Sequence, residues 1–177
     1  MNREETGKIL FIISGMFPRQ YSNMSPQQID AITSTWADML EDYEFSTVQQ
    51  AVKALFATSK WPPSIAEVIE KCQYILNGGQ EPLNEQAAWS LVNKAITNSS
   101  YHAKEEFEKL PKVIQNVIHD PGQLREWARS EKSSIETVVA SNFMRSYKTE
   151  LVREKEQQAL PESVKTLISS IDVKMIE

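Results

Sequence analysis

The chain has 177 residues, of which 41% are hydrophobic and 24% are charged, a balance typical of a globular protein rather than a disordered one. Its net charge of −5 disfavours a protein that mainly neutralises nucleic-acid phosphates. A single cysteine excludes an internal disulfide and a multi-cysteine zinc site, and no stretch approaches the roughly 18 apolar residues of a membrane span. We therefore expect a cytoplasmic protein without membrane contact.

Apolar residues recur at helical spacing, glycine is scarce and long β-branched runs are absent, so the sequence predicts an all-α fold. In the first half we expect four helices that pack as a small bundle. Their predicted inner faces are, in chain order, Ile9, Ile12, Ile13, Met16 and Phe17; Ile29, Ile32, Trp36, Met39 and Leu40; Val48, Ala51, Val52, Leu55 and Phe56; and Ile65, Val68, Ile69 and Cys72.

Polar residues mark the predicted helix ends. A serine followed three residues later by Gln or Glu predicts a capping box, in which each side chain bonds the other residue's backbone N–H group. The pattern occurs at Ser25 and Gln28, Ser46 and Gln49, Ser64 and Glu67, and Ser133 and Glu136. Gly78 and Gly79 predict the end of the fourth helix, because glycine adopts the left-handed conformation at little cost.

Residues 78–84 combine glycine, proline and polar side chains, and predict a linker between an N-terminal domain, 1–77, and a C-terminal helical region, 85–177. The C-terminal region is expected to hold a long helix followed by a tail that begins at Leu160-Pro161. The long helix carries one predicted apolar stripe, Ile135, Val138, Val139, Phe143, Tyr147 and Leu151.

No pattern in the sequence indicates catalysis. The histidines, His102 and His119, lack the short spacings of metal ligands and are expected at the surface or in turns. Cys72 lies on an apolar helix face, where a thiol is usually inert. Neighbouring carboxylates such as Glu105 and Glu106 point to different helix faces. We predict a binding protein that is not an enzyme and has no cofactor or metal.

Two surfaces are candidates for that binding. The long helix carries Arg145, Lys148, Arg153 and Lys155 near its C-terminal part, and is either a core helix with a solvated back or a partner-binding helix. In the tail, four apolar residues have the spacing of anchors that enter a groove on another protein: Val164, Leu167, Ile168 and Ile171.

The segment "ILFIISGMFP", followed by "TWADMLEDYEFSTVQQAVKALFATSKWPPSIAEVIE", resembles the N-terminal domain of phage helicase loader-and-inhibitor proteins from Gram-positive hosts. The resemblance covers roughly residues 5–76. The residues that carry it include Phe17, Pro18, Trp36, Trp61, Pro62, Pro63, Ile65 and Glu67. Blocks in the second half, among them "LPKVIQNVI" and "LREWARS", look like a phage pattern often found behind that domain.

The resemblance implies a non-enzymatic adaptor. Such a protein binds the hexameric DnaB-type replicative helicase, restrains it and delivers it to origin DNA through a phage initiator or replisome organiser, with indirect or weak DNA contact of its own. The hypothesised helicase contacts are Phe143, Arg145, Tyr147, Lys148, Leu151, Leu160, Pro161 and Leu167. A DNA-binding replisome organiser or regulator and a pure inhibitor of a host replication protein stay open as alternatives.

The double proline has a structural interpretation of its own. Pro62 and Pro63 are expected to hold an extended entry to the fourth helix, since a residue before proline is driven out of the helical region. Ser64 and Glu67 then cap that helix, and Trp61 is expected to cover the end of the bundle. In this interpretation the corner needs no partner.

Overall fold

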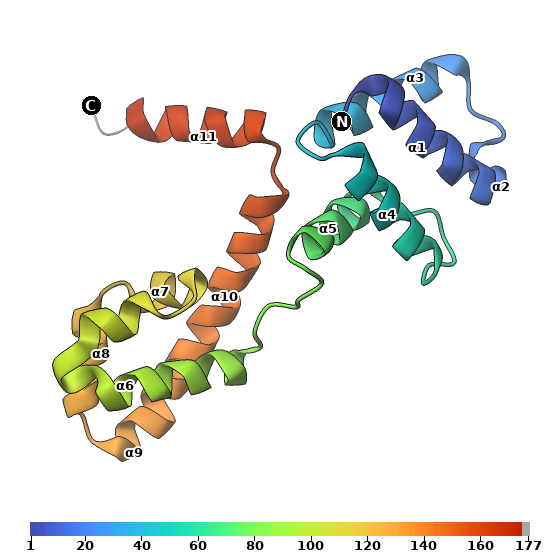
Figure 1. Cartoon of the computed structure of the whole chain (residues 1–177). Coiled ribbons are helices and arrows are strands. Elements are labelled where there is room, and N and C mark those ends of the chain that lie inside the picture. The colour runs from blue at the N-terminus through green and yellow to red at the C-terminus, as the bar shows by residue number, and fades with distance from the viewer. Residues whose placement is uncertain (175–177) are drawn as a thin grey trace. The chain divides into compact units, whose positions relative to one another are not determined.

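The structure is a computed structural model that describes the backbone of residues 1–174 and the side chains of residues 1–171. The chain is 78% helical, and the described part contains no strand, which confirms the all-α prediction (Figure 1). Contacts divide it into two compact units. The first unit comprises Met1–Glu81 and the segment that begins at Gln157, and the second comprises Pro82–Glu156. The predicted division into a domain at 1–77, a linker at 78–84 and a helical region at 85–177 stays a prediction.

The first unit is built on five helices. These are α1 (Arg3–Met16), α2 (Pro18–Tyr21), α3 (Pro26–Met39), α4 (Phe45–Phe56) and α5 (Ile65–Leu76). Helix α1 packs against α3 and α4, and α4 packs against α5. The core between them consists of apolar side chains: Ile9, Leu10, Ile13, Leu40, Val48, Ala51, Val52, Leu55, Val68, Ile69 and Cys72. Burial of this face, rather than helix propensity, holds these short helices in place.

Two of the capping boxes that the sequence predicts in this unit are present in the structure. Ser25 with Gln28 and Ser64 with Glu67 form complete boxes at the starts of α3 and α5. The box predicted at Ser46 is wrong: the N-cap of α4 is Glu44, two residues earlier, and it makes no side-chain bond. A box that we did not predict joins Asn2 to Glu5 at the start of α1. Gly78 and Gly79 adopt positive φ angles of 69° and 73° after α5, as expected.

Three residues that we expected on inner faces are exposed. In α1 the buried residues are Thr6, Ile9, Leu10 and Ile13, so Ile12 and Met16 lie on the flank of the helix. Ile29 is 51% exposed because α3 packs mainly against α1, and its apolar side chains meet the core only as half-buried neighbours. The helical spacing of the apolar residues in α1 and α3 was predicted correctly, but the predicted buried faces were wider than the observed ones.

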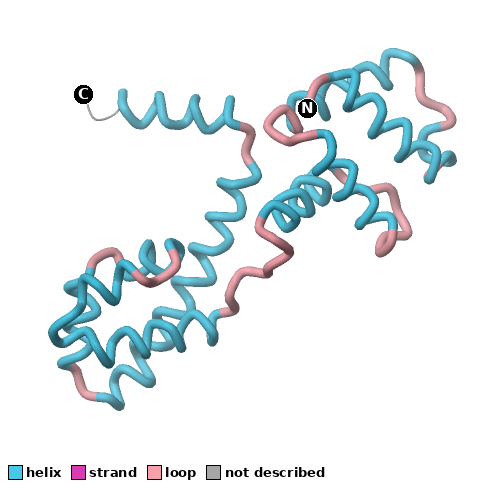
Figure 2. The backbone as a smooth tube through the Cα atoms, in the orientation of Figure 1, coloured by secondary structure: helices cyan, strands magenta, loops and turns pink. Residues whose placement is uncertain are grey.

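The second unit contains α6 (Glu85–Glu108), α7 (Lys112–Ile118), α8 (Pro121–Arg129), α9 (Lys132–Ser134), the π-turn η1 (Ile135–Val139) and α10 (Ala140–Ala159), whose last three residues belong to the first unit (Figure 2). Helix α6 packs mainly against α8 and has non-helical backbone angles at His102. The core of this unit is Ala88, Val92, Ala95, Ile96, Leu110, Ile114, Ile118, Leu124, Ile135, Phe143 and Tyr147.

The long helix was predicted, but its start differs from the prediction. Residues 132–159 run as one helical segment in which η1 has the wider i→i+5 spacing of a π-helix. This extra residue per turn shifts the register, so Val138 leaves the predicted stripe and is 58% exposed. The expected capping box at Ser133 and Glu136 does not form, because the N-cap is Glu131 and makes no side-chain bond.

Candidate partner-binding surfaces

The helix α11 (Glu162–Lys174) presents an uncovered apolar stripe. Its exposed members are Val164, Leu167, Ile168 and Ile171, which have exposed fractions between 38% and 61%. Their spacing of i, i+3, i+4 and i+7 places them on one face of the helix. Glu162 and Lys165 form an ion pair with each other at 2.9 Å, so these two charges near the helix start are already matched. The stripe is therefore an apolar surface available to a groove on another protein.

The start of α11 is fixed to the first unit by contacts that local sequence could not indicate. The backbone N–H of Glu162 donates to the Asp42 carboxylate at 2.8 Å, across 120 residues of sequence. Pro161 is buried, and Ala159 packs against the core of the first unit. Asp42 thus satisfies one of the amide groups that a helix start leaves without an intrahelical partner. The tail begins as a positioned helix rather than as a free tether.

Two of the hypothesised contact residues on α10 lie in the core of the second unit. Phe143 is 3% and Tyr147 is 2% exposed, and their rings stack at a centroid distance of 5.9 Å. Trp89 lies against Phe143 at 5.6 Å, and the Tyr147 hydroxyl donates to the Leu83 carbonyl oxygen at 3.0 Å. Burial raises the pKa of the Tyr147 phenol. These side chains support α10 from inside and are not available to a partner.

The other hypothesised contacts divide by exposure. Arg145 and Lys148 are exposed on α10, and the described residues show no ion pair for either. Leu151 and Leu160 are half-buried, whereas Leu167 is 61% exposed. The set is divided between the two units: Arg145 and Lys148 belong to the second unit, and Leu160, Pro161 and Leu167 belong to the first.

Most residues of the family pattern have structural roles in the first unit. Phe17 meets Phe56 edge to face at a ring distance of 5.9 Å, and Pro18 occupies the first position of α2. Trp36 and Ile65 are half-buried against the core. These contacts explain why the pattern is spread along the sequence: it records packing between elements rather than a contiguous motif.

The corner between α4 and α5 differs from the expectation in one respect. Pro63 is buried and the Ser64–Glu67 box caps α5, as predicted. The Glu67 carboxylate accepts from the Ser64 backbone N–H at 2.7 Å and from the Ser64 hydroxyl at 2.7 Å, and these bonds lower the pKa of Glu67. Trp61, however, does not cover the end of the bundle. Its side chain is 71% exposed, because the prolines turn it outward from the core that Pro63 enters.

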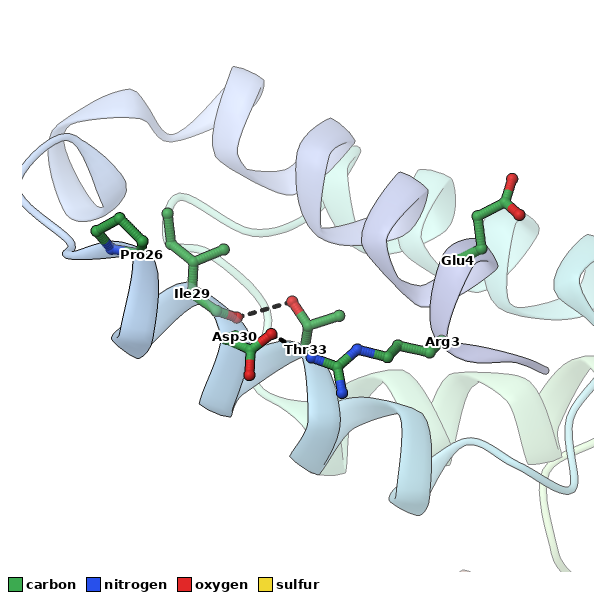
Figure 3. Close-up of a pocket in the computed structure, with 6 residues that line it drawn as sticks. All are labelled: Arg3, Glu4, Pro26, Ile29, Asp30 and Thr33. Atoms are coloured by element: carbon green, nitrogen blue, oxygen red, sulfur yellow. Dashed lines mark hydrogen bonds and ion pairs between the residues drawn. The ribbon is translucent and has the colours of Figure 1, made fainter.

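A shallow groove between α1 and α3 is lined by Arg3, Glu4, Pro26, Ile29, Asp30 and Thr33 (Figure 3). Its charged groups are matched: Arg3 pairs with Asp30, and Glu4 pairs with Lys8 at 2.9 Å. The Thr33 hydroxyl donates to the Ile29 carbonyl oxygen of its own helix. No titratable group in this groove is left to act on a substrate, and the groove offers no arrangement for acid–base chemistry.

The other residues considered for chemistry are Cys72 and the histidines His102 and His119. Cys72 is fully buried, and burial raises its pKa to about 12, so the thiol is not a nucleophile at neutral pH. The histidines are exposed as predicted, His102 at the kink of α6 and His119 in a turn with φ of 71°. The described residues contain no cluster of His, Cys, Asp or Glu that could hold a metal ion. Over the same residues, no helix is long and apolar enough to cross a membrane.

Comparison with known protein families gives a match to most of the first unit's N-terminal segment. Residues 1–69 match the family model for the N-terminal domain of the helicase loader/inhibitor protein of phage SPP1. The match covers α1 to α4 and the first part of α5, and it does not extend to α6–α11. No curated protein and no solved structure gives a significant match to the chain. The resemblance predicted from the sequence is thus confirmed over residues 1–69.

Proposed function

We propose that this chain is a non-enzymatic adaptor that binds the hexameric DnaB-type replicative helicase, restrains it and helps to load it at an origin during phage or prophage DNA replication. It would act in the cytoplasm of the bacterial host, together with a phage initiator or replisome organiser. The observation that carries the proposal is the match of residues 1–69 to the helicase loader/inhibitor domain. The same charge balance that disfavours phosphate binding favours a protein partner.

The proposed helicase contact is the apolar stripe of α11. It supplies a continuous uncovered face of helical anchors on a helix whose start is held by Asp42. A helix that is already formed and positioned loses less conformational entropy on binding than a disordered tail does. Leu167 remains in the proposed contact, and Val164, Ile168 and Ile171 join it. Arg145 and Lys148 are a second exposed surface that the helicase could meet through acidic side chains.

Full-length surface variants test this contact better than a truncation near Ala140 does. Such a truncation removes Phe143 and Tyr147 from the core of the second unit and would disrupt its fold. The double variant Leu167→Gln and Ile171→Gln keeps good helix-forming character and removes the apolar anchors. We expect it to bind a purified DnaB-type helicase about 10-fold more weakly than the wild type, the size of a substantial interface truncation.

The matched control is Leu91→Gln, because Leu91 is 38% exposed on α6, a different helix from those of both proposed surfaces. Unchanged helicase binding by the α11 double variant would rule out the stripe as the contact. Absence of binding by the wild-type chain would rule out the proposed function itself. Restraint and loading are then separated by measuring helicase activity on origin DNA with and without the initiator. A loader permits unwinding when the initiator is present, whereas a pure inhibitor does not.

A further inference from the structure

The exposed side chain of Trp61 is not explained by the fold. At 71% exposure it contributes little to the core, and the described residues provide no ring or cation partner for its indole and no acceptor for its Nε1–H group. The other tryptophans of the chain, at positions 36, 89 and 127, are half-buried. A large exposed aromatic side chain carries a cost in solubility, and such side chains are enriched in protein interfaces.

The backbone around Trp61 is held unusually firmly for a loop. The Ser59 hydroxyl donates to the Trp61 carbonyl oxygen at 2.8 Å and accepts from the Trp61 N–H at 3.2 Å. On the other side Pro62 and Pro63 fix their own φ angles, and Pro63 is buried. The capping box of α5 follows directly. The indole is therefore displayed from a rigid base, so that little backbone entropy is lost when it enters a pocket.

The charge around this corner selects the class of partner. Residues 82–156 carry as many Lys and Arg as Asp and Glu, so the net charge of −5 resides in the rest of the chain, which includes the corner. Glu67 and Glu70 are exposed on the first turns of α5, and within residues 59–72 Lys60 and Lys71 balance their charge. A stacking platform for nucleic acid needs a positively charged groove. The corner has no such positive excess, and the net negative charge of the unit to which it belongs favours a protein surface with basic side chains instead.

We propose that Trp61 anchors the N-terminal bundle to a protein partner, with its indole entering an apolar pocket that is bordered by basic side chains. For the identity of the partner the proposal rests on the proposed function, which supplies the replicative helicase. The anchor is a second contact beside α11, and it gives the double-proline corner a role in binding as well as in folding.

The test compares the affinity of full-length Trp61→Ala and the wild type for a purified DnaB-type helicase. We expect a loss of about 30-fold, the effect of truncating an aromatic hot spot. The control is Tyr101→Ala, because Tyr101 is 90% exposed on α6 of the second unit and we expect its removal to change the affinity less than about 3-fold. Both variants should keep the wild-type melting temperature, since each removes an exposed side chain.

Tryptophan fluorescence gives a second readout. Helicase binding should shift the emission of the wild type to shorter wavelength as the indole leaves water, and Trp61→Phe should abolish that shift. Wild-type affinity in Trp61→Ala would overturn the anchor while leaving the proposed function intact. A wild-type chain that binds no helicase would remove both proposals. Loss of self-association, or of binding to a single-stranded oligonucleotide, in Trp61→Ala with unchanged helicase affinity would also overturn it, in favour of a second copy or of base stacking.

Discussion

The Asp42 carboxylate should determine how firmly the start of α11 is held. It accepts from the Glu162 N–H at 2.8 Å and is the partner that the structure gives to that first-turn amide. Replacing it by alanine leaves the amide to water and removes a negative charge from the positive end of the helix dipole. The loss of an N-cap costs about 1 kcal/mol, so the equilibrium for opening this turn should shift about five-fold toward the open state.

Native-state hydrogen exchange at the amides of residues 162–165 measures that opening directly. Asp42→Ala should exchange about five-fold faster there than the wild type, while amides in α4 and α5 keep their protection. Asp42→Asn retains an acceptor oxygen and should fall between the two. Asp38→Ala is the control, because Asp38 is an exposed carboxylate near the end of α3 for which the described residues show no hydrogen bond or ion pair.

Two results would refute this reasoning. Exchange in α11 that is the same in Asp42→Ala and the wild type would mean that the carboxylate does not hold the helix. Equal acceleration in Asp38→Ala would mean that the effect comes from the general acidity of the α3–α4 link and not from the bond to Glu162. A large fall in the melting temperature of the whole first unit is not expected, because the bond lies at the surface.

Other residues give shorter predictions. Ile114→Ala should destabilise the second unit by about 3 kcal/mol in chemical denaturation, because Ile114 is fully buried and its removal leaves a cavity. Cys72 should not react with a thiol reagent at neutral pH until denaturant is added, since it is buried and its pKa is raised to about 12. The pKa of Glu67 is lowered in the folded state, so its contribution to stability is complete above the ordinary glutamate pKa of about 4.3. This contribution is lost as the pH falls through the lowered pKa. Glu67→Gln should therefore reduce the fall in melting temperature that the wild type shows at acid pH.

Local features of this fold were predictable because their causes lie within a few residues of sequence. The Ser25 and Ser64 capping boxes and the stop at Gly78 and Gly79 depend on side chains that bond, or backbone angles that form, within the same turn. The failures are equally local. At Ser46 and at Ser133 a matching pattern lost to a helix whose N-cap lies two residues earlier, at Glu44 and Glu131.

The candidate binding surfaces were predictable only in part, since exposure depends on the whole packing arrangement. The apolar spacing of α11 could be read from its sequence, but its attachment through Asp42 crosses 120 residues and leaves no local signal. The spacing of Phe143 and Tyr147 fits either a core or a contact, and only their burial in the folded second unit shows that they belong to its core. Trp61 was expected to cover the end of the bundle, and only the packed fold shows that its side chain is 71% exposed.

The attachment point of α11 and the proposed Trp61 anchor lie at opposite ends of α4. Asp42, which holds the start of α11, precedes this 12-residue helix, and Trp61 follows it, so these two positions are separated by a helix about 18 Å long. A standard protein interface, at about 800 Å² on each side, is about 30 Å wide and can include both.

Because sites this far apart contribute independently, their losses should multiply. A chain that carries Trp61→Ala together with Leu167→Gln and Ile171→Gln should bind the helicase about 300-fold more weakly than the wild type, the product of about 30-fold and about 10-fold. Affinity no weaker than that of Trp61→Ala alone would mean that one bound helicase does not use both surfaces. In that case α11 and Trp61 would serve different partners, and the loading reaction, rather than simple binding, would be the assay in which both are required.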